Sequence, residues 1–273
     1  MVVARALCAV AAAMVIVPIS ARAEGHAPRV MSLDSCADQY VLALAPRASI
    51  VGLSYRAGAP DSYMRAAAVG LPRRRATFES LVSARPEVVV RLWGGDARLT
   101  AALDRRGVRT VRLDDAADFD GVRANVRRVA QALDRREAGE RLLARMDGQL
   151  KASAGAWKGE RALYLTPGGY TAGSGTLIDA MLKASGLSNA AQGPFFSPVP
   201  LETLVMTPPR AVVLGFFDLT RAGSDRWGPG RHAALKRATG DRTIASLPGA
   251  VVGCPAWFVA DATAQLAGAR NAR

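Results

Sequence analysis

Few residues of this chain have the types and spacing needed for catalysis or metal binding. Its 2 histidines, His26 and His232, are too few for a multi-histidine metal site, and no H-E-x-x-H occurs. The G-x-S-x-G, C-x-x-C and G-x-G-x-x-G patterns are also absent. Asp34, Ser35 and Asp38 could serve a hydrolase, but no pair of base and nucleophile can be named. We therefore expect no enzyme, no metal site and no bound cofactor.

A glycine-rich segment, residues 166–176, joins a predicted strand to a predicted helix. It lacks the Gly-Lys-Ser/Thr ending of a nucleotide-binding loop. Its backbone amides and Tyr170 could face a ligand at the helix N-terminus. Alternatively, the segment is a tight turn that requires small residues.

Aromatic and cationic side chains follow several predicted strands. Trp93 precedes Gly94-Gly95, and Trp257 follows Pro255 near the end of the chain. Loops at strand ends place ligand contacts in α/β proteins, so both rings suit a flat or bulky apolar ligand, although core packing is the alternative for each. Arg56 and Arg91, also next to strand ends, would suit an anionic ligand.

The elements that would position these residues alternate between short apolar strands and helical patterns, which predicts parallel sheets with crossover helices. In the first half the predicted strands are 29–33, 50–54, 87–92 and 108–113, and the predicted helices are 37–45, 78–84 and 97–106. The pattern restarts with strands 161–165 and 211–216 and helices 176–185, 200–206, 232–239 and 260–269.

Between the halves lie two helical stretches without a strand. Apolar residues recur on one face of residues 121–133, which Asp118 or Asp120 can cap. The stretch 137–153 is predicted to link two lobes, with an ordinary surface helix as the alternative. We expect two Rossmann-like α/β lobes, residues 24–136 and 154–273, joined by this single long helix, with a ligand cleft between them.

The N-terminus has the pattern of a secretory signal peptide. One positive charge, an apolar run and Ala21-Arg22-Ala23 predict cleavage after residue 23. The run is too short to span a membrane, so we expect a protein free in the periplasm. The formal net charge of +13 invites a nucleic-acid hypothesis, but export and the scattered arginines favour a solvated basic surface and no nucleic-acid partner.

Only Cys36 and Cys254 would remain after cleavage, in a compartment where thiols tend to be oxidised. They would form either one disulfide, which would tie the two lobes together, or two separate buried thiols.

Four segments of the mature chain occur in the order known from one protein family: 29–44, 77–90, 171–176 and 200–213. Through them the chain resembles substrate-binding proteins of ABC importers for ferric siderophores, haem and cobalamin. The resemblance implies a monomer with limited hinge motion between its lobes. It also implies that Glu79 and Glu202 dock on arginines of the two subunits of an ABC permease dimer at the inner membrane.

The resemblance does not specify the ligand. The haem-coordinating residues of such proteins cannot be picked out among Tyr55, Tyr63, Tyr170 and His232. Arginines at strand ends would suit an anionic ferric siderophore, whereas tryptophans would suit cobalamin. We favour an iron complex, either a ferric siderophore or haem, with cobalamin as the alternative.

Overall fold

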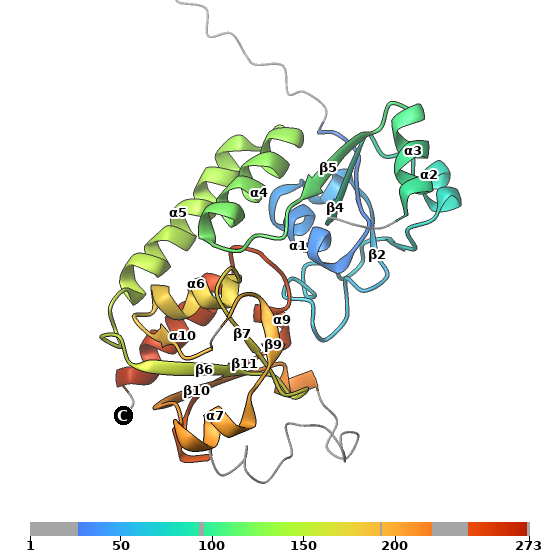
Figure 1. Ribbon diagram of the computed structural model, residues 1–273. Helices are drawn as coiled ribbons and strands as arrows, with labels where there is room; N and C mark the ends of the chain where they lie inside the picture. The colour runs from blue at the N-terminus through green and yellow to red at the C-terminus, as the bar shows by residue number, and fades with distance from the viewer. Residues whose placement is uncertain (1–26, 93–95, 192, 220–239, 272–273) are drawn as a thin grey trace, which may run out of the picture.

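The computed structural model describes residues 27–92, 96–191, 193–219 and 240–271. The chain forms two lobes, each built on a parallel sheet, and two long helices lie along one side of the molecule (Figure 1). No helix among the described residues is long and apolar enough to cross a membrane.

The first lobe contains a five-stranded parallel sheet in the order β3-β2-β1-β4-β5. Its central strands are rich in valine and largely buried, as expected for a sheet covered on both faces. The strands are β1 (Val30–Ser32), β2 (Ile50–Ser54), β3 (Arg73–Arg74), β4 (Val88–Leu92) and β5 (Arg109–Leu113), and the helices are α1 (Ser35–Leu44), α2 (Phe78–Ala84) and α3 (Ala97–Arg105).

The second lobe contains a four-stranded parallel sheet in the order β11-β10-β6-β8 and a separate antiparallel pair, β7-β9. The strands are β6 (Arg161–Leu165), β7 (Tyr170–Ala172), β8 (Ser188–Asn189), β9 (Phe196–Pro198), β10 (Ala211–Gly215) and β11 (Thr243–Leu247). The helices are α6 (Leu177–Ala184), α7 (Leu201–Met206), α9 (Gly249–Val252) and α10 (Val259–Asn271).

Two helices, α4 (Phe119–Ala132) and α5 (Arg136–Ser153), connect the two sheets in the chain. Asp118 caps α4 by accepting a hydrogen bond from the amide of Gly121 at 2.8 Å, so the first of the two predicted caps is the one used. Helix α5 packs against α4 of the first lobe and α10 of the second. It therefore spans both lobes, as the sequence predicted for a linking helix.

The core is shared between the lobes. Buried apolar residues of both sheets, of α5 and of α10 belong to one continuous cluster. A continuous core resists separation of the lobes, because opening it would expose apolar surface to water. The two-lobed α/β fold predicted from the sequence is confirmed. The sequence did not predict the strands β3, β7, β8, β9 and β11 or the short helix α9, and the predicted helix 232–239 lies outside the described residues.

Candidate functional site

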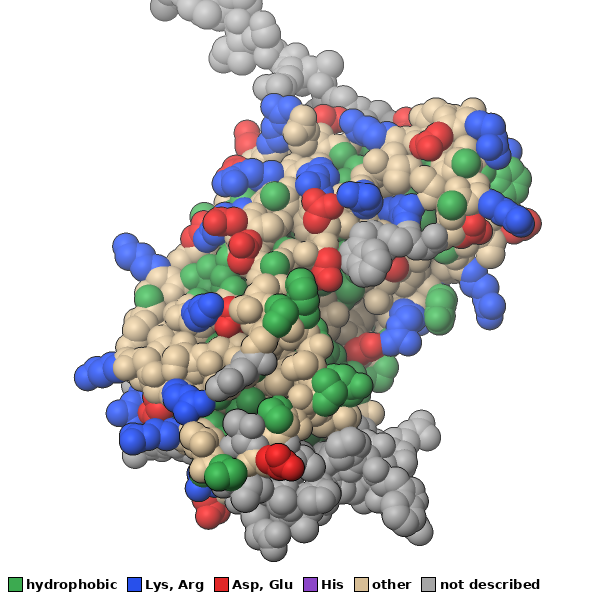
Figure 2. All heavy atoms as spheres, viewed as in Figure 1, with side chains coloured by type: hydrophobic (Ala, Val, Ile, Leu, Met, Phe, Trp, Pro, Cys, Tyr) green, Lys and Arg blue, Asp and Glu red, His purple; other side chains and the backbone are tan. Residues whose placement is uncertain are grey.

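Segments that follow the carboxyl ends of strands from the two sheets meet between the lobes. Cys36 follows the carboxyl end of β1 and Cys254 lies beyond that of β11, and a disulfide joins them. Ligands of open α/β sheets bind outside the carboxyl ends of the strands, so the space between the lobes is the candidate site. In Figure 2 the outline of the molecule is indented between the two lobes, on the side away from α5.

Aromatic rings also join the two lobes. Tyr40 of α1 contacts Trp257 edge to face, with ring centroids 5.5 Å apart, and donates a hydrogen bond to the carbonyl of Pro255. Trp257 also meets Phe258 edge to face. Only 8% of Trp257 is exposed, so most of its ring packs between the lobes. This is the core packing that the sequence analysis gave as the alternative to a ligand contact.

A second contact joins Tyr63 of the first lobe to α10 and the residue before it. The ring of Tyr63 stacks on Phe258 at 4.2 Å, and its hydroxyl donates to Asp261, which also accepts from Gln149 of α5. Burial and the neighbouring Asp261 carboxylate raise the pKa of Tyr63 to about 12. The phenol therefore stays a neutral donor at physiological pH, and its oxygen is already engaged within the protein.

We call these contacts the interlobe seam. Its members are Cys36, Tyr40 and Tyr63 from the first lobe and Cys254, Pro255, Trp257, Phe258 and Asp261 from the second.

On the first lobe, Tyr55 and Arg56 follow the carboxyl end of β2. The side chain of Tyr55 is 66% exposed. Arg56 forms an ion pair with Asp61, yet 46% of its side chain remains exposed to solvent. Tyr55 thus offers a free phenol, and Arg56 keeps donors available for an anionic ligand.

Arg91 is held more firmly than Arg56. It is partly buried near the end of β4 and donates to the hydroxyl of Thr100 at 2.6 Å and to the carbonyl of Leu92. The neighbouring Trp93, predicted as a ligand contact, lies outside the described residues.

Buried Asp38 positions the strand ends next to this site. Its carboxylate accepts hydrogen bonds from the hydroxyl of Ser32 in β1 and from the amide and hydroxyl of Ser54 in β2, the last two at 2.8 and 2.6 Å. Burial raises the pKa of Asp38. This network holds β1, β2 and α1 together. It therefore fixes the position of the backbone from which Tyr55 and Arg56 extend.

Asp34 has a comparable structural role. It caps α1 by accepting from the amides of Cys36 and Ala37, and its second oxygen accepts from the amide of Leu92 at 2.7 Å. Both aspartates considered for a hydrolase are therefore engaged in local structure.

On the second lobe, the antiparallel pair β7-β9 and the preceding Phe195 present three exposed rings. Tyr170 is 48% exposed, Phe195 66% and Phe196 55%. We call these three residues the aromatic ribbon. The sequence predicted Tyr170 but not the phenylalanines, because the pairing of two short segments far apart in the chain, such as Ala172 with Phe196, leaves no periodic signal.

The glycine-rich segment owes its conformation to this pairing. A Cβ at Gly173 would lie 2.0 Å from the carbonyl oxygen of Gly193, so only glycine fits there. The amides of Gly173 and Ser174 donate to the carbonyls of Phe195 and Gly193. The prediction that amides of this segment face a ligand is wrong for these two, because both are already bonded within the protein.

The comparisons with known proteins agree with this architecture. Residues 30–216 match the model of the periplasmic binding protein family. The chain belongs to that family. Among solved structures, it is similar to the periplasmic heme-binding protein BhuT in complex with two hemes, with 27% identity, a TM-score of 0.67, and coverage of 89% of this chain and 99% of that one.

Two further solved structures share the fold of this periplasmic binding protein. The periplasmic heme-binding protein HutB of Vibrio cholerae is 17% identical with a TM-score of 0.72, covering 88% of this chain and 98% of that one. The vitamin B12-binding protein BtuF of Vibrio cholerae is 16% identical with a TM-score of 0.62, covering 90% and 97%. No significant match was found among curated protein sequences.

Glu79 and Glu202 occupy matching positions in the two lobes of this periplasmic binding protein. Each lies in the first turn of a short helix, α2 or α7. The strand that follows each helix pairs with the first strand of its own sheet, β4 with β1 and β10 with β6. Both side chains are exposed. Hydrogen bonds from the Glu79 amide and the Thr77 hydroxyl hold the pKa of the Glu79 carboxyl below its usual value.

No cluster of histidine, cysteine, aspartate and glutamate that could hold a metal ion occurs among the described residues. Acidic and basic side chains are interspersed over the face shown in Figure 2, as expected of a solvated surface.

Proposed function

We propose that this periplasmic binding protein binds a bulky iron complex, haem or a ferric siderophore, between its lobes and delivers it to an ABC permease dimer. The aromatic ribbon carries this proposal. Its three large rings, carried by the β7-β9 pair and the residue before β9, are each about half exposed or more, and flat aromatic or macrocyclic ligands bury such surface.

The two sides of the candidate site offer different chemistry. The aromatic ribbon on the second lobe suits an apolar face, while Tyr55 and Arg56 on the first lobe supply a phenol and a guanidinium. Phenolate oxygen is a known ligand of haem iron, and guanidinium pairs with carboxylates such as the propionates of haem. Among the described residues, Tyr55 and Tyr170 are thus the candidate iron ligands, because the hydroxyl of Tyr63 is engaged with Asp261. His232 lies outside the described residues.

Cobalamin is the alternative ligand. One of the solved structures with this fold is a vitamin B12-binding protein. The phenylalanines of the aromatic ribbon favour a large, mostly neutral corrinoid as much as they favour haem, whereas Arg56 and Arg91 favour the anionic iron complexes.

Delivery depends on one docking carboxylate on each lobe, Glu79 and Glu202. Their matching places in α2 and α7 support this assignment, because a permease of two subunits would meet one carboxylate per subunit. Export through a signal peptide over residues 1–23 and a monomeric state complete the proposal.

Titration of the purified mature protein with haemin, ferrichrome and cyanocobalamin tests the ligand, with the fluorescence of its 4 tryptophans as the signal. We expect saturable quenching by haemin or ferrichrome at one equivalent. Binding of cyanocobalamin alone would replace the iron complex by the alternative. A folded protein that binds none of the three would contradict the proposed ligand class.

Alanine variants test the aromatic ribbon. We expect Phe195→Ala with Phe196→Ala to weaken binding about tenfold or more, because large rings dominate the energetics of such contacts. Met206→Ala is the matched control, since Met206 is 84% exposed and lies on α7. Equal affinity of the two variants would exclude the aromatic ribbon from the site.

A further inference from the structure

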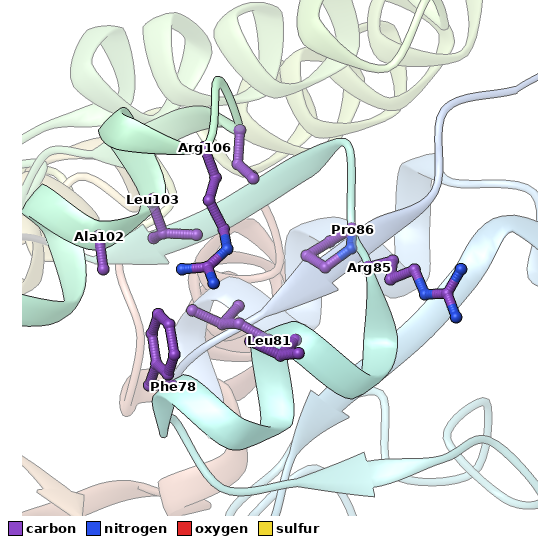
Figure 3. A pocket seen from close by; sticks show the side chains of 9 residues that line it. Phe78, Leu81, Arg85, Pro86, Ala102, Leu103 and Arg106 are labelled. Carbon is purple, nitrogen blue, oxygen red and sulfur yellow. The ribbon is translucent and has the colours of Figure 1, made fainter.

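An apolar groove lies between α2 and α3, on the first lobe and outside the candidate ligand site. Its volume is about 390 Å³. Figure 3 shows side chains of both helices converging on it. Its lining includes Phe78, Leu81, Val82 and Leu103, and its charged members are Arg85 and Arg106.

The floor of the groove is part of the hydrophobic core, whereas its rim is exposed to solvent. Leu81 and Leu103 are 6% and 2% exposed, whereas Phe78 and Val82 are 41% and 46% exposed. Two large apolar side chains on adjacent turns of one short helix, beside a concave surface, are typical of a protein-binding site.

The charged members define what the groove would accept. The guanidinium of Arg106 lies over the ring of Phe78, 4.2 Å from its centroid. Among the residues that the structure describes, neither Arg106 nor Arg85 forms an ion pair. An arginine stacked on an exposed ring is a preferred contact in protein interfaces, and it would pair with a carboxylate of the partner.

The docking carboxylate Glu79 is part of the same surface. Glu79 and Val82 are three residues apart on α2, which makes them neighbours on the helix surface. A protein that binds Glu79 therefore comes next to Val82 and the groove. A second copy of this chain is a poor occupant, because its net charge of +13 opposes self-association at a rim that carries two arginines.

We propose that this groove receives an apolar side chain from a periplasmic segment of the permease. That segment carries a cation for Glu79 on one side of the apolar side chain and a carboxylate for Arg106 on the other. The inference rests on the proposed docking function and deepens it. The groove would add apolar contact area to the ion pair of Glu79 and would fix how the permease segment is positioned along α2.

Photocrosslinking in cells that produce the full chain tests this inference. p-Benzoylphenylalanine replaces Val82, or Val69 as the control, since Val69 is 65% exposed and does not line the groove. We expect Val82 to crosslink to a multispanning membrane protein, identified by mass spectrometry as an ABC permease, and Val69 not to. Equal crosslinking from both positions, or none from Val82, would overturn the inference.

A reporter on the other lobe separates this inference from the docking proposal. The crosslinker replaces Met206, which lies four residues beyond Glu202 on α7. We expect Val82→Asp to reduce the yield of the Met206 crosslink about tenfold and Val69→Asp to leave it unchanged. An unchanged yield in Val82→Asp would contradict the groove alone, whereas no Met206 crosslink in the parent would contradict docking itself.

Discussion

Cys36 and Cys254 stand 218 residues apart in the chain, yet their Cα atoms lie 5.4 Å apart in a disulfide between the two lobes. The chain through α5 is the first covalent connection between the lobes, and this disulfide is the second. The stacked pair of Tyr63 and Phe258 adds apolar contact beside it. Opening of the ligand site would have to break or bend the interlobe seam, so we expect only small motion between the lobes on ligand binding.

Removal of the disulfide should lower the free energy of unfolding. We expect Cys36→Ser with Cys254→Ser to cost about 2–5 kcal/mol, because the bridge restricts a loop of most of the chain in the unfolded state. Urea denaturation of the variant and the oxidised parent measures the difference. A midpoint equal to that of the oxidised parent would show that the bridge does not stabilise the seam.

Loss of the Tyr63 hydroxyl should weaken the seam more modestly. Tyr63→Phe keeps the ring on Phe258 but removes the hydrogen bond to Asp261, so we expect a loss of about 0.5–1.5 kcal/mol in the free energy of unfolding. Tyr55→Phe is the control, because Tyr55 is 66% exposed and should change stability little. Equal effects of the two substitutions would contradict the role assigned to the Asp261 contact.

The buried Asp38 should make stability fall as the pH rises. Its pKa is raised in the folded protein, so the folded state binds a proton more tightly than the unfolded state between the ordinary and the raised pKa. Within that window each step to higher pH lowers the free energy of unfolding.

We expect Asp38→Asn to remove this contribution, which the melting temperatures of parent and variant from about pH 4 to pH 7 would reveal. Parallel pH profiles for the two proteins would show that Asp38 titrates as an ordinary carboxyl.

Neutralising the docking carboxylates should impair import without impairing ligand binding. We expect Glu79→Gln with Glu202→Gln to bind haemin or cyanocobalamin as the parent does, but to support about tenfold less uptake or worse. Glu137→Gln with Asp241→Asn is the matched control, because it removes the same charge from exposed positions outside α2 and α7. Normal uptake by the docking variant would refute the assignment.

Docking should also persist at mildly acidic pH. The pKa of Glu79 is lowered, so its carboxylate stays ionised below the pH at which an ordinary glutamate is protonated. The crosslink between Met206 and the permease, measured from pH 7 down to about pH 5, should keep its yield. A loss of the crosslink near pH 6, with the fold intact, would contradict this expectation.

Local patterns predicted most of the elements that frame the site. The helix Phe78–Ala84 and the strands Ile50–Ser54 and Arg161–Leu165 appear with the predicted bounds, because their apolar periodicity and capping residues are local properties. Glu79 and Glu202 could be placed on their helices for the same reason. The aromatic ribbon could not, since three-residue strands acquire their conformation from pairing across the chain.

Composition, periodicity and family resemblance were sufficient for the two-lobed α/β fold and the periplasmic binding protein family. The sequence left the pairing of Cys36 with Cys254 and the placement of Trp257 open, and folding resolves both, because each depends on which segments meet across the core. The groove beside Glu79 likewise exists only in the folded chain. Side chains from two helices that are separated by a strand form its walls, so no local sequence pattern predicts it.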